Sequence, residues 1–432
     1  MSNKERNNVF SIRNFRLVFF GALVSELGTS LYSFAVGFYI LKISANNAFL
    51  QGLYLAVCGV VLLLFTPVGG VFGDRFNKAR IMFICDYLKG GVILLATLLM
   101  LMFRENSIHI AILFAAGILG NAVSGIFNPA SHALLPYIVD EEKLQQGNSY
   151  FSMKNALVNI FGILLAGVLY AAMPIQQLFF IVGICYVLSG VSEMFIRYES
   201  IPKEDKLTFR SALGDMQEGL VYLKTQKAII ALVVATLFIN FFLTPVFSNF
   251  VPYFVSTDVA GAPSYLFHEY LKPELWSSVF IMLIGLSSLV GSLIYSTLPP
   301  KDKCGYSTAL RTCGMAAVLI AATIAYWQLV ACGRSLNAFL IFMSLGSFLM
   351  GLLLVFINIP LSTMMMRIVD KEKISKVSSL TSMASQGLIP IASVMAGIVL
   401  QWSGITMLLA LCSAGLLATA LSMLFDKEIR KI

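Results

Sequence analysis

The sequence predicts an all-α membrane protein with twelve transmembrane helices in two parallel six-helix halves. Apolar runs of about 20 residues, the length that crosses a bilayer, recur along the whole chain. The Lys and Arg residues gather in alternate connecting segments. A short charged pattern also occurs twice, as Ile-Val-Asp-Glu-Glu-Lys at 138–143 and as Ile-Val-Asp-Lys-Glu-Lys at 368–373.

Composition argues against most other classes of protein. The chain has 432 residues, of which 58% are hydrophobic and 12% charged, whereas soluble domains are roughly 25% charged. Its seven cysteines and three histidines are scattered without metal-ligand spacing, and no nucleotide-binding P-loop pattern occurs. We therefore expect no metal or other cofactor and no nucleotide-driven pump. We also expect no enzyme activity, because the apolar segments carry no set of convergent catalytic groups.

Each apolar run is expected to form one helix. The expected spans are 15–41, 50–72, 81–103, 108–130, 150–172, 177–197, 228–255, 276–298, 307–331, 335–360, 377–400 and 403–425. The polar segment 198–227 is expected to link an N-terminal half, 1–197, to a C-terminal half, 228–432. Amphipathic spacing from Leu213 to Lys224 predicts a short helix on the membrane surface within this linker.

The distribution of positive charge predicts the orientation of the chain. With the N-terminus inside, the expected outer segments carry only Lys42, Arg104, Lys272 and Arg334 among 30 Lys and Arg residues. Cytoplasmic loops carry the excess of these residues in membrane proteins. We therefore expect a multi-pass protein of the cell (plasma) membrane with both termini in the cytoplasm. The net charge of +8 is interpreted as a sign of topology rather than of nucleic-acid binding.

The repeated pattern predicts the symmetry of the fold. Its two copies follow the fourth and the tenth expected spans, so six spans separate them and both copies lie on the same side of the membrane. Parallel halves related by an axis along the membrane normal are one of the arrangements from which transporters are built. The pore is therefore expected between the two halves.

Glu26 is the expected proton-coupling residue. It lies about 16 Å into the first span at 1.5 Å per residue, close to the middle of the bilayer. A charge at that depth is costly, and no Lys or Arg lies one helical turn away. Because burial disfavours the charged form of a carboxyl, a lone Glu there is expected to exchange a proton near neutral pH. A permanently protonated carboxyl that joins helices by hydrogen bonds is the alternative.

Three further ionisable groups are expected within the spans. Asp86 and Lys89 are three residues apart on one helix face and are expected to pair. A charge cluster that locks the inner gate is favoured there over a substrate site. Glu193 precedes Arg197 by four residues, which predicts a solvated ion pair near the membrane surface.

Neutral polar residues recur at helical spacing in several spans and are the candidates for a substrate cavity. Hydrogen bonds between helices, which contribute about 0.6 kcal/mol on average, would explain the same stripes. With no buried Arg expected to pair with an anion, such a cavity suits a lipophilic, neutral or cationic molecule. The candidates are Thr29, Tyr32, Asn121, Asn128, Asn155, Asn159, Asn240, Thr244, Asn358 and Gln386.

The segment from Gly70 to Arg80, Gly-Val-Phe-Gly-Asp-Arg-Phe-Asn-Lys-Ala-Arg, resembles the G-x-x-x-D-R-x-G-R-[RK] signature of the major facilitator superfamily. The resemblance extends over essentially the whole chain. Asn77 replaces the second Gly of the signature, and Asn tolerates left-handed backbone angles, so the turn is expected to survive. The gating residues that the resemblance implies, with the neighbouring carboxylate, are Gly70, Asp74, Arg75, Lys78 and Asp86.

A second segment is similar to one branch of that superfamily. Residues 127–136, Phe-Asn-Pro-Ala-Ser-His-Ala-Leu-Leu-Pro, resemble the branch that contains macrolide-efflux proteins. The resemblance implies a monomeric secondary active transporter that works by alternating access, with protons and a lipophilic drug or similar small molecule as its partners in the bilayer. Export or flipping of a lipid-like or siderophore-like metabolite is the alternative. The antiporter pattern G-P-x-x-G-G is incomplete at 162–167, where Pro and one Gly are missing.

Overall fold

The computed structural model describes residues 9–139, 144–198, 227–297, 305–368, 381 and 383–431. Over these residues the chain is helical apart from short connections, and it contains no strand. The chain forms two compact units. One contains the described residues of Met1–Ile43 and Val57–Phe209, and the other contains those of Ser44–Ala56 and Arg210–Ile432.

The predicted fold class is confirmed. In the described part of the chain, 11 helices are long and apolar enough to cross a membrane. The last of them, Met383–Phe425, contains the twelfth expected span and the eleventh from Met383 onward. Gly404 separates these two spans, because its φ of 79° lies in the left-handed region that glycine adopts without strain. The all-α membrane fold therefore has the twelve expected spans in two halves.

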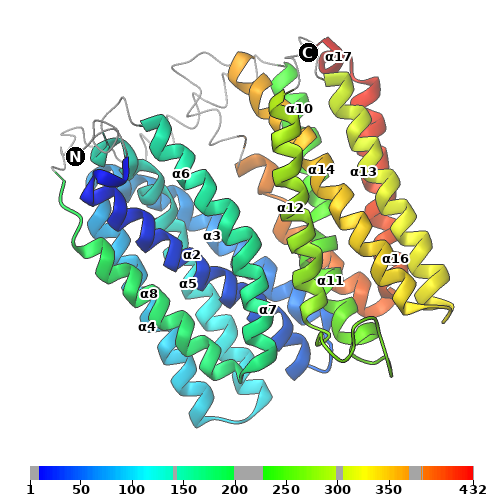
Figure 1. The fold of residues 1–432 in the computed structure, drawn as a ribbon, viewed down its shortest axis with the longest axis horizontal. Coiled ribbons are helices and arrows are strands. Elements are labelled where there is room, and N and C mark those ends of the chain that lie inside the picture. The colour runs from blue at the N-terminus through cyan, green and yellow to red at the C-terminus, as the bar shows by residue number, and fades with distance from the viewer. Residues whose placement is uncertain are drawn as a thin grey trace. The chain divides into compact units, whose positions relative to one another are not determined.

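The first unit is a bundle in which α8 packs along both α2 and α4, and α4 packs along α5 (Figure 1). Its fifth span is continuous through α6, a π-helical turn and α7. The elements are η1 (Val9–Ser11), α2 (Arg13–Ile43), most of α3 (Ala48–Arg75), α4 (Lys78–Met102), α5 (Asn106–Ile138), α6 (Leu144–Leu157), η3 (Val158–Gly162), α7 (Ile163–Ala172) and α8 (Ile175–Met194).

Two glycines permit the close approach of α3 to α5 within this unit. A Cβ atom on Gly69 would clash with the carbonyl oxygen of Gly125. A Cβ atom on Gly125 would lie 2.8 Å from Cβ of Phe65, well inside ordinary contact distance. Small residues at helix crossings are the usual way in which membrane helices pack without a hydrophobic driving force.

The second unit packs α10 and α13 along α16, and α12 along α14. The first residues of α3 also belong to it, since the amide of Ala48 donates to Oε1 of Gln401 at 2.9 Å. Its other elements are α10 (Lys227–Pro245), η4 (Val246–Phe250), α11 (Val251–Phe254), η5 (Val255–Val259), α12 (Leu275–Thr297), α13 (Gly305–Tyr326), η6 (Trp327–Ala331), α14 (Leu336–Ile368), α16 (Ile389–Phe425) and α17 (Lys427–Lys431).

Two predicted features lie outside the described residues. One is the surface helix expected from Leu213 to Lys224. The other is the charged part of the repeat, at 140–143 and 369–373. The residues that lead into both copies are described, and they end the long helices α5 and α14 at Ile138 and Ile368.

Candidate functional site

An ion pair between a buried lysine and a partly exposed glutamate joins α6 to α2 in the first unit. The ammonium nitrogen of Lys154 lies 2.5 Å from Oε1 of Glu26. The Lys154 side chain is 3% exposed, whereas the Glu26 side chain is 40% exposed. Lys154 also lies 5.0 Å from the centre of the Phe151 ring, a cation–π contact. The cation is therefore enclosed by the unit, while its carboxylate partner remains accessible.

The expectation of a lone carboxyl at Glu26 is wrong. Lys154 is 128 residues away in sequence. Because Lys154 is near the start of the span expected at 150–172, sequence reasoning places the Lys154 charge at a helix end. The structure instead buries the side chain. The sequence signal for this ion pair is the presence of Lys154 within an apolar run, because a charge inside the membrane requires a partner.

The predicted pairing of Asp86 with Lys89 is confirmed. Both side chains are buried on α4, with the Lys89 nitrogen 3.9 Å from Oδ1 of Asp86. Ser25, next to Glu26 on α2, donates a hydrogen bond to the same Asp86 oxygen at 3.1 Å. The Lys89 ammonium also lies 4.3 Å from the centre of the Phe127 ring. These contacts tie α2, α4 and α5 together beside the Glu26–Lys154 pair.

The expectation of a solvated Glu193–Arg197 ion pair is wrong. Glu193 is fully buried, and neither of its carboxylate oxygens has a hydrogen-bond partner among the described residues. The i,i+4 spacing fails because α8 ends at Met194, so Arg197 continues on non-helical backbone. The backbone of Arg197 pairs there with the side chain of Asn14. The Arg197 amide donates to Oδ1 of Asn14 at 3.2 Å, and Nδ2 of Asn14 donates to the Arg197 carbonyl at 2.5 Å.

Two of the cavity candidates on α2 make contacts within the first unit. Thr29 shares a hydrogen bond of 3.0 Å with the hydroxyl of Tyr186 and donates to the carbonyl of Ser25 at 3.0 Å. The ring of Tyr32 packs against Phe179 with centroids 5.3 Å apart. These contacts favour a role between helices for Thr29 and Tyr32, the alternative that the sequence left open.

The remaining candidates of the first unit divide into two kinds. Asn121 is half-buried and donates to the Gly117 carbonyl of its own helix at 2.8 Å. Asn128, Asn155 and Asn159 are exposed, although all three lie within apolar spans. These amides are exposed in the described part of this unit, as are Thr29 and, in part, Glu26.

The candidates of the second unit divide in the same way. Asn240 is half-buried and donates to the Ser385 carbonyl at 3.1 Å. Thr244 lies one turn further along α10 and is also half-buried. Asn358 on α14 and Gln386 are exposed. The structure brings Asn240 close to Ser385, next to Gln386.

The turn after α3 differs from the expected left-handed one. Asn77 has φ −60° and ψ 115°, and its side chain accepts a hydrogen bond from the Arg80 amide at 3.2 Å, so it caps the N-terminus of α4. The gating candidates Gly70, Asp74 and Arg75 lie on the last turns of α3, and their side chains lie outside the described part of the structure. Lys78 is buried, with its ammonium 4.3 Å from the centre of the Tyr137 ring.

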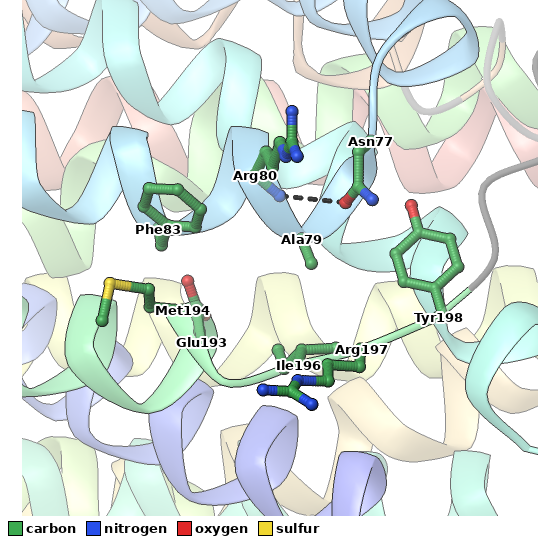
Figure 2. Close-up of a pocket in the computed structure, with 9 residues that line it drawn as sticks. All are labelled: Asn77, Ala79, Arg80, Phe83, Glu193, Met194, Ile196, Arg197 and Tyr198. Atoms are coloured by element: carbon green, nitrogen blue, oxygen red, sulfur yellow. Dashed lines mark hydrogen bonds between the residues drawn. The ribbon is translucent and has the colours of Figure 1, made fainter.

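A pocket of about 550 Å³ opens at this end of the first unit (Figure 2). It lies between the start of α4 and the end of α8, and buried Glu193 reaches it from α8. The residues that line it are Asn77, Ala79, Arg80, Phe83, Glu193, Met194, Ile196, Arg197 and Tyr198. Glu193 therefore belongs to the wall of this pocket, although its side chain is buried.

Sequence reasoning also missed Arg311, since it expects no buried Arg. This half-buried residue lies in the span Gly305–Ala331 and donates from Nη1 to the Phe356 carbonyl of α14 at 2.6 Å. The signal for it lies in Pro360, four residues after Phe356. Proline has no N–H, so the Phe356 carbonyl lacks its normal helical donor. Arg311 supplies the missing hydrogen bond.

None of these groups makes a metal centre. Among the described residues, no three His, Cys, Asp or Glu side chains lie close enough together to hold a metal ion. The chemistry that the first unit can perform is ionic: a partly exposed carboxylate, an enclosed ammonium that neutralises it, and a second, buried carboxyl at the end of α8 that has no hydrogen-bond partner among the described residues.

Comparison with known proteins identifies the family of the chain. The sequence model of the Major Facilitator Superfamily matches residues 18–394. The chain is 24% identical over 389 residues to the MFS-type transporter YkuC of Bacillus subtilis, covering 86% of this chain and 82% of that protein. It is 21% identical over 309 residues to macrolide efflux protein A of Streptococcus pyogenes, covering 67% and 75%.

Solved structures share the fold at low sequence identity. A bacterial homologue of the iron transporter ferroportin, in the inward-facing state, aligns with a TM-score of 0.72 at 17% identity, over 96% of this chain and 98% of that one. A peptide transporter of the POT type aligns with a TM-score of 0.74 at 14% identity, over 96% and 95%. Both likenesses concern the fold alone.

Proposed function

Because the chain belongs to the Major Facilitator Superfamily and is therefore a membrane transporter, we propose that it exports lipophilic small molecules in exchange for protons by alternating access. Both termini are cytoplasmic and the protein works as a monomer in the plasma membrane. The charge distribution supports this orientation, since basic residues are concentrated in the segments expected inside.

The ion pair between Glu26 and Lys154 carries the proposal. An ionised carboxylate that is 40% exposed within an apolar span is accessible to protons and to ligands. Its partner Lys154, at 3% exposure, requires a counter-charge whichever ligand is present. Binding of a proton or a cation at Glu26 therefore has a direct consequence for a buried charge, which is the coupling that an antiporter requires.

The accessible polar groups support a neutral or cationic substrate. In the first unit these include the Glu26 carboxylate and the exposed amides of Asn128, Asn155 and Asn159. Such groups suit a lipophilic molecule with a few hydrogen-bonding groups or an amine. Macrolide efflux protein A, a relative at 21% identity, supports the same class of substrate for this chain.

A drug-susceptibility panel tests the proposal. Cells that express the protein are compared with cells that express Glu26→Gln and with cells that express Glu105→Gln, a matched exposed carboxyl in the connection before α5. We expect raised resistance to lipophilic compounds with the wild type and Glu105→Gln, and loss of resistance with Glu26→Gln at equal expression.

Everted membrane vesicles extend the test to coupling. Uptake of an active compound should stop when a protonophore collapses the proton gradient, and should be absent with Glu26→Gln. If expression of the protein raises resistance to none of the compounds, the result favours export of a lipid-like or siderophore-like metabolite instead. Gradient-driven uptake that persists with Glu26→Gln would remove Glu26 from proton coupling.

A further inference from the structure

Glu193 is the interior group that the proposed function leaves unused. Its side chain is fully buried, and within the described residues neither carboxylate oxygen receives a hydrogen bond. An ionised carboxylate in that condition is strongly disfavoured, because neither water nor a donor compensates its charge. A neutral, protonated carboxyl accounts for this environment at much lower cost.

Charged groups from two neighbouring helices act on Glu193. They are Asp86 and Lys89 of α4 and Lys154 of α6, and Cys85 of α4 is also near. Lys89 is engaged by Asp86 and lies over two aromatic rings. Lys154 has Glu26 as its ion-pair partner among the described residues. Of the two lysines, Lys154 is the one whose ammonium depends on a single accessible carboxylate.

Lys154 pairs with Glu26 and is also one of the charges that act on Glu193. Glu193 packs against Gly21 of α2, where an added Cβ would lie 3.2 Å from its Cγ. Glu26 lies five residues further along the same helix, a rise of about 7.5 Å combined with a turn of about 140° around the helix axis. The flexible four-carbon stem of Lys154 allows its ammonium to move over such a distance without movement of the helices.

We propose that Glu26 and Glu193 share one proton and that Lys154 pairs with whichever carboxylate lacks it. In the present structure Lys154 pairs with Glu26, and Glu193 holds the proton. When Glu26 takes up a proton, Lys154 moves to Glu193, which releases its own. The number of bound protons and the net charge are the same in both states.

This inference rests on the proposed function and specifies how exchange occurs. A cationic substrate that pairs with Glu26 displaces Lys154 to Glu193, and the Glu193 proton leaves. One positive charge enters as one proton departs. The pocket between α4 and α8, which Glu193 lines, provides the route by which that proton leaves (Figure 2). The exchange is therefore electroneutral at the site.

Infrared spectroscopy of the purified full-length protein at neutral pH tests the shared proton without any substrate. The carbonyl stretch of a protonated carboxyl is distinct from the bands of a carboxylate. We expect such a band in the wild type and its loss in Glu193→Gln, which assigns it. The same band should disappear in Glu26→Gln, because Lys154 then pairs with an ionised Glu193. It should persist in the control Glu105→Gln.

A double variant guards against misfolding of Glu26→Gln. Removal of the ammonium as well, in Glu26→Gln/Lys154→Met, should restore the Glu193 band, because no cation remains to stabilise the carboxylate. A band that persists in Glu26→Gln, or that the double variant does not restore, overturns the inference. These spectra do not measure transport. If they overturn the shared proton while the vesicle experiment shows proton-dependent export, the proposed function stands without the shared proton.

Discussion

The ammonium of Lys154 lies 2.5 Å from Oε1 of Glu26, and this contact joins two helices whose residues are 128 positions apart. The pair is asymmetric, since the cation is 3% exposed and the carboxylate 40%. Loss of the Glu26 carboxylate leaves an enclosed ammonium that needs another partner, whereas loss of Lys154 leaves a partly exposed carboxylate. The cost of breaking the pair therefore depends on which partner is removed.

A double-mutant cycle on the two glutamates should reveal strong coupling. Glu26→Gln and Glu193→Gln each leave Lys154 one carboxyl, so each alone should lower stability by only about 1 kcal/mol. The double variant leaves Lys154 buried with neither glutamate and should lose about 3–5 kcal/mol. Thermal unfolding in detergent measures the three variants. The control pair Glu193→Gln and Glu105→Gln should give additive shifts in the unfolding temperature. Additive shifts for Glu26→Gln and Glu193→Gln as well would show that Lys154 does not alternate between the two glutamates.

Glycine at the crossing of α3 and α5 provides a second prediction. Gly125→Ala should destabilise the protein by about 1–3 kcal/mol, because its Cβ would meet the backbone and Cβ of Phe65. Gly120 is five residues earlier on the same helix and has open space around an added Cβ. Gly120→Ala should therefore be stabilising by roughly 0.5–1 kcal/mol. Equal unfolding midpoints for the two variants would contradict the observed close approach.

The spans and the local pairs were predictable from the sequence, and the contacts between helices were not. Asp86 and Lys89 pair at the i,i+3 spacing that a helix provides, and the structure shows the pair at 3.9 Å. The same rule fails for Glu193 and Arg197, because the helix ends at Met194. Periodicity describes each helix separately, so it gives no partner for Lys154.

Asn77 gives a third prediction, which separates a helix cap from a left-handed turn. With φ −60° and its side chain accepting from the Arg80 amide, Asn77→Ala should cost about 1 kcal/mol. Asn77→Asp should be nearly neutral, since it retains the acceptor. Asn77→Gly, which restores the residue usual in the superfamily signature, should cost a few tenths of a kcal/mol. Stabilisation by Gly in thermal unfolding would instead support a left-handed turn.

Arg311 and Pro360 provide the last prediction, in which one substitution rescues another. Arg311→Met removes the 2.6 Å hydrogen bond to the Phe356 carbonyl. It should lower stability by about 1–3 kcal/mol, the cost of an unsatisfied buried acceptor. Pro360→Ala restores a backbone N–H four residues after Phe356. The double variant Arg311→Met/Pro360→Ala should therefore unfold at a higher temperature than Arg311→Met.

The comparison with Pro360→Ala alone completes this cycle. In that variant Arg311 still donates to the Phe356 carbonyl, so the new N–H competes for an acceptor that is already satisfied, and the gain in stability should be small. A gain from Pro360→Ala that is equal with and without Arg311 would show that the guanidinium does not replace the missing helical donor. A larger gain without Arg311 would confirm that the proline and the arginine act on the same carbonyl.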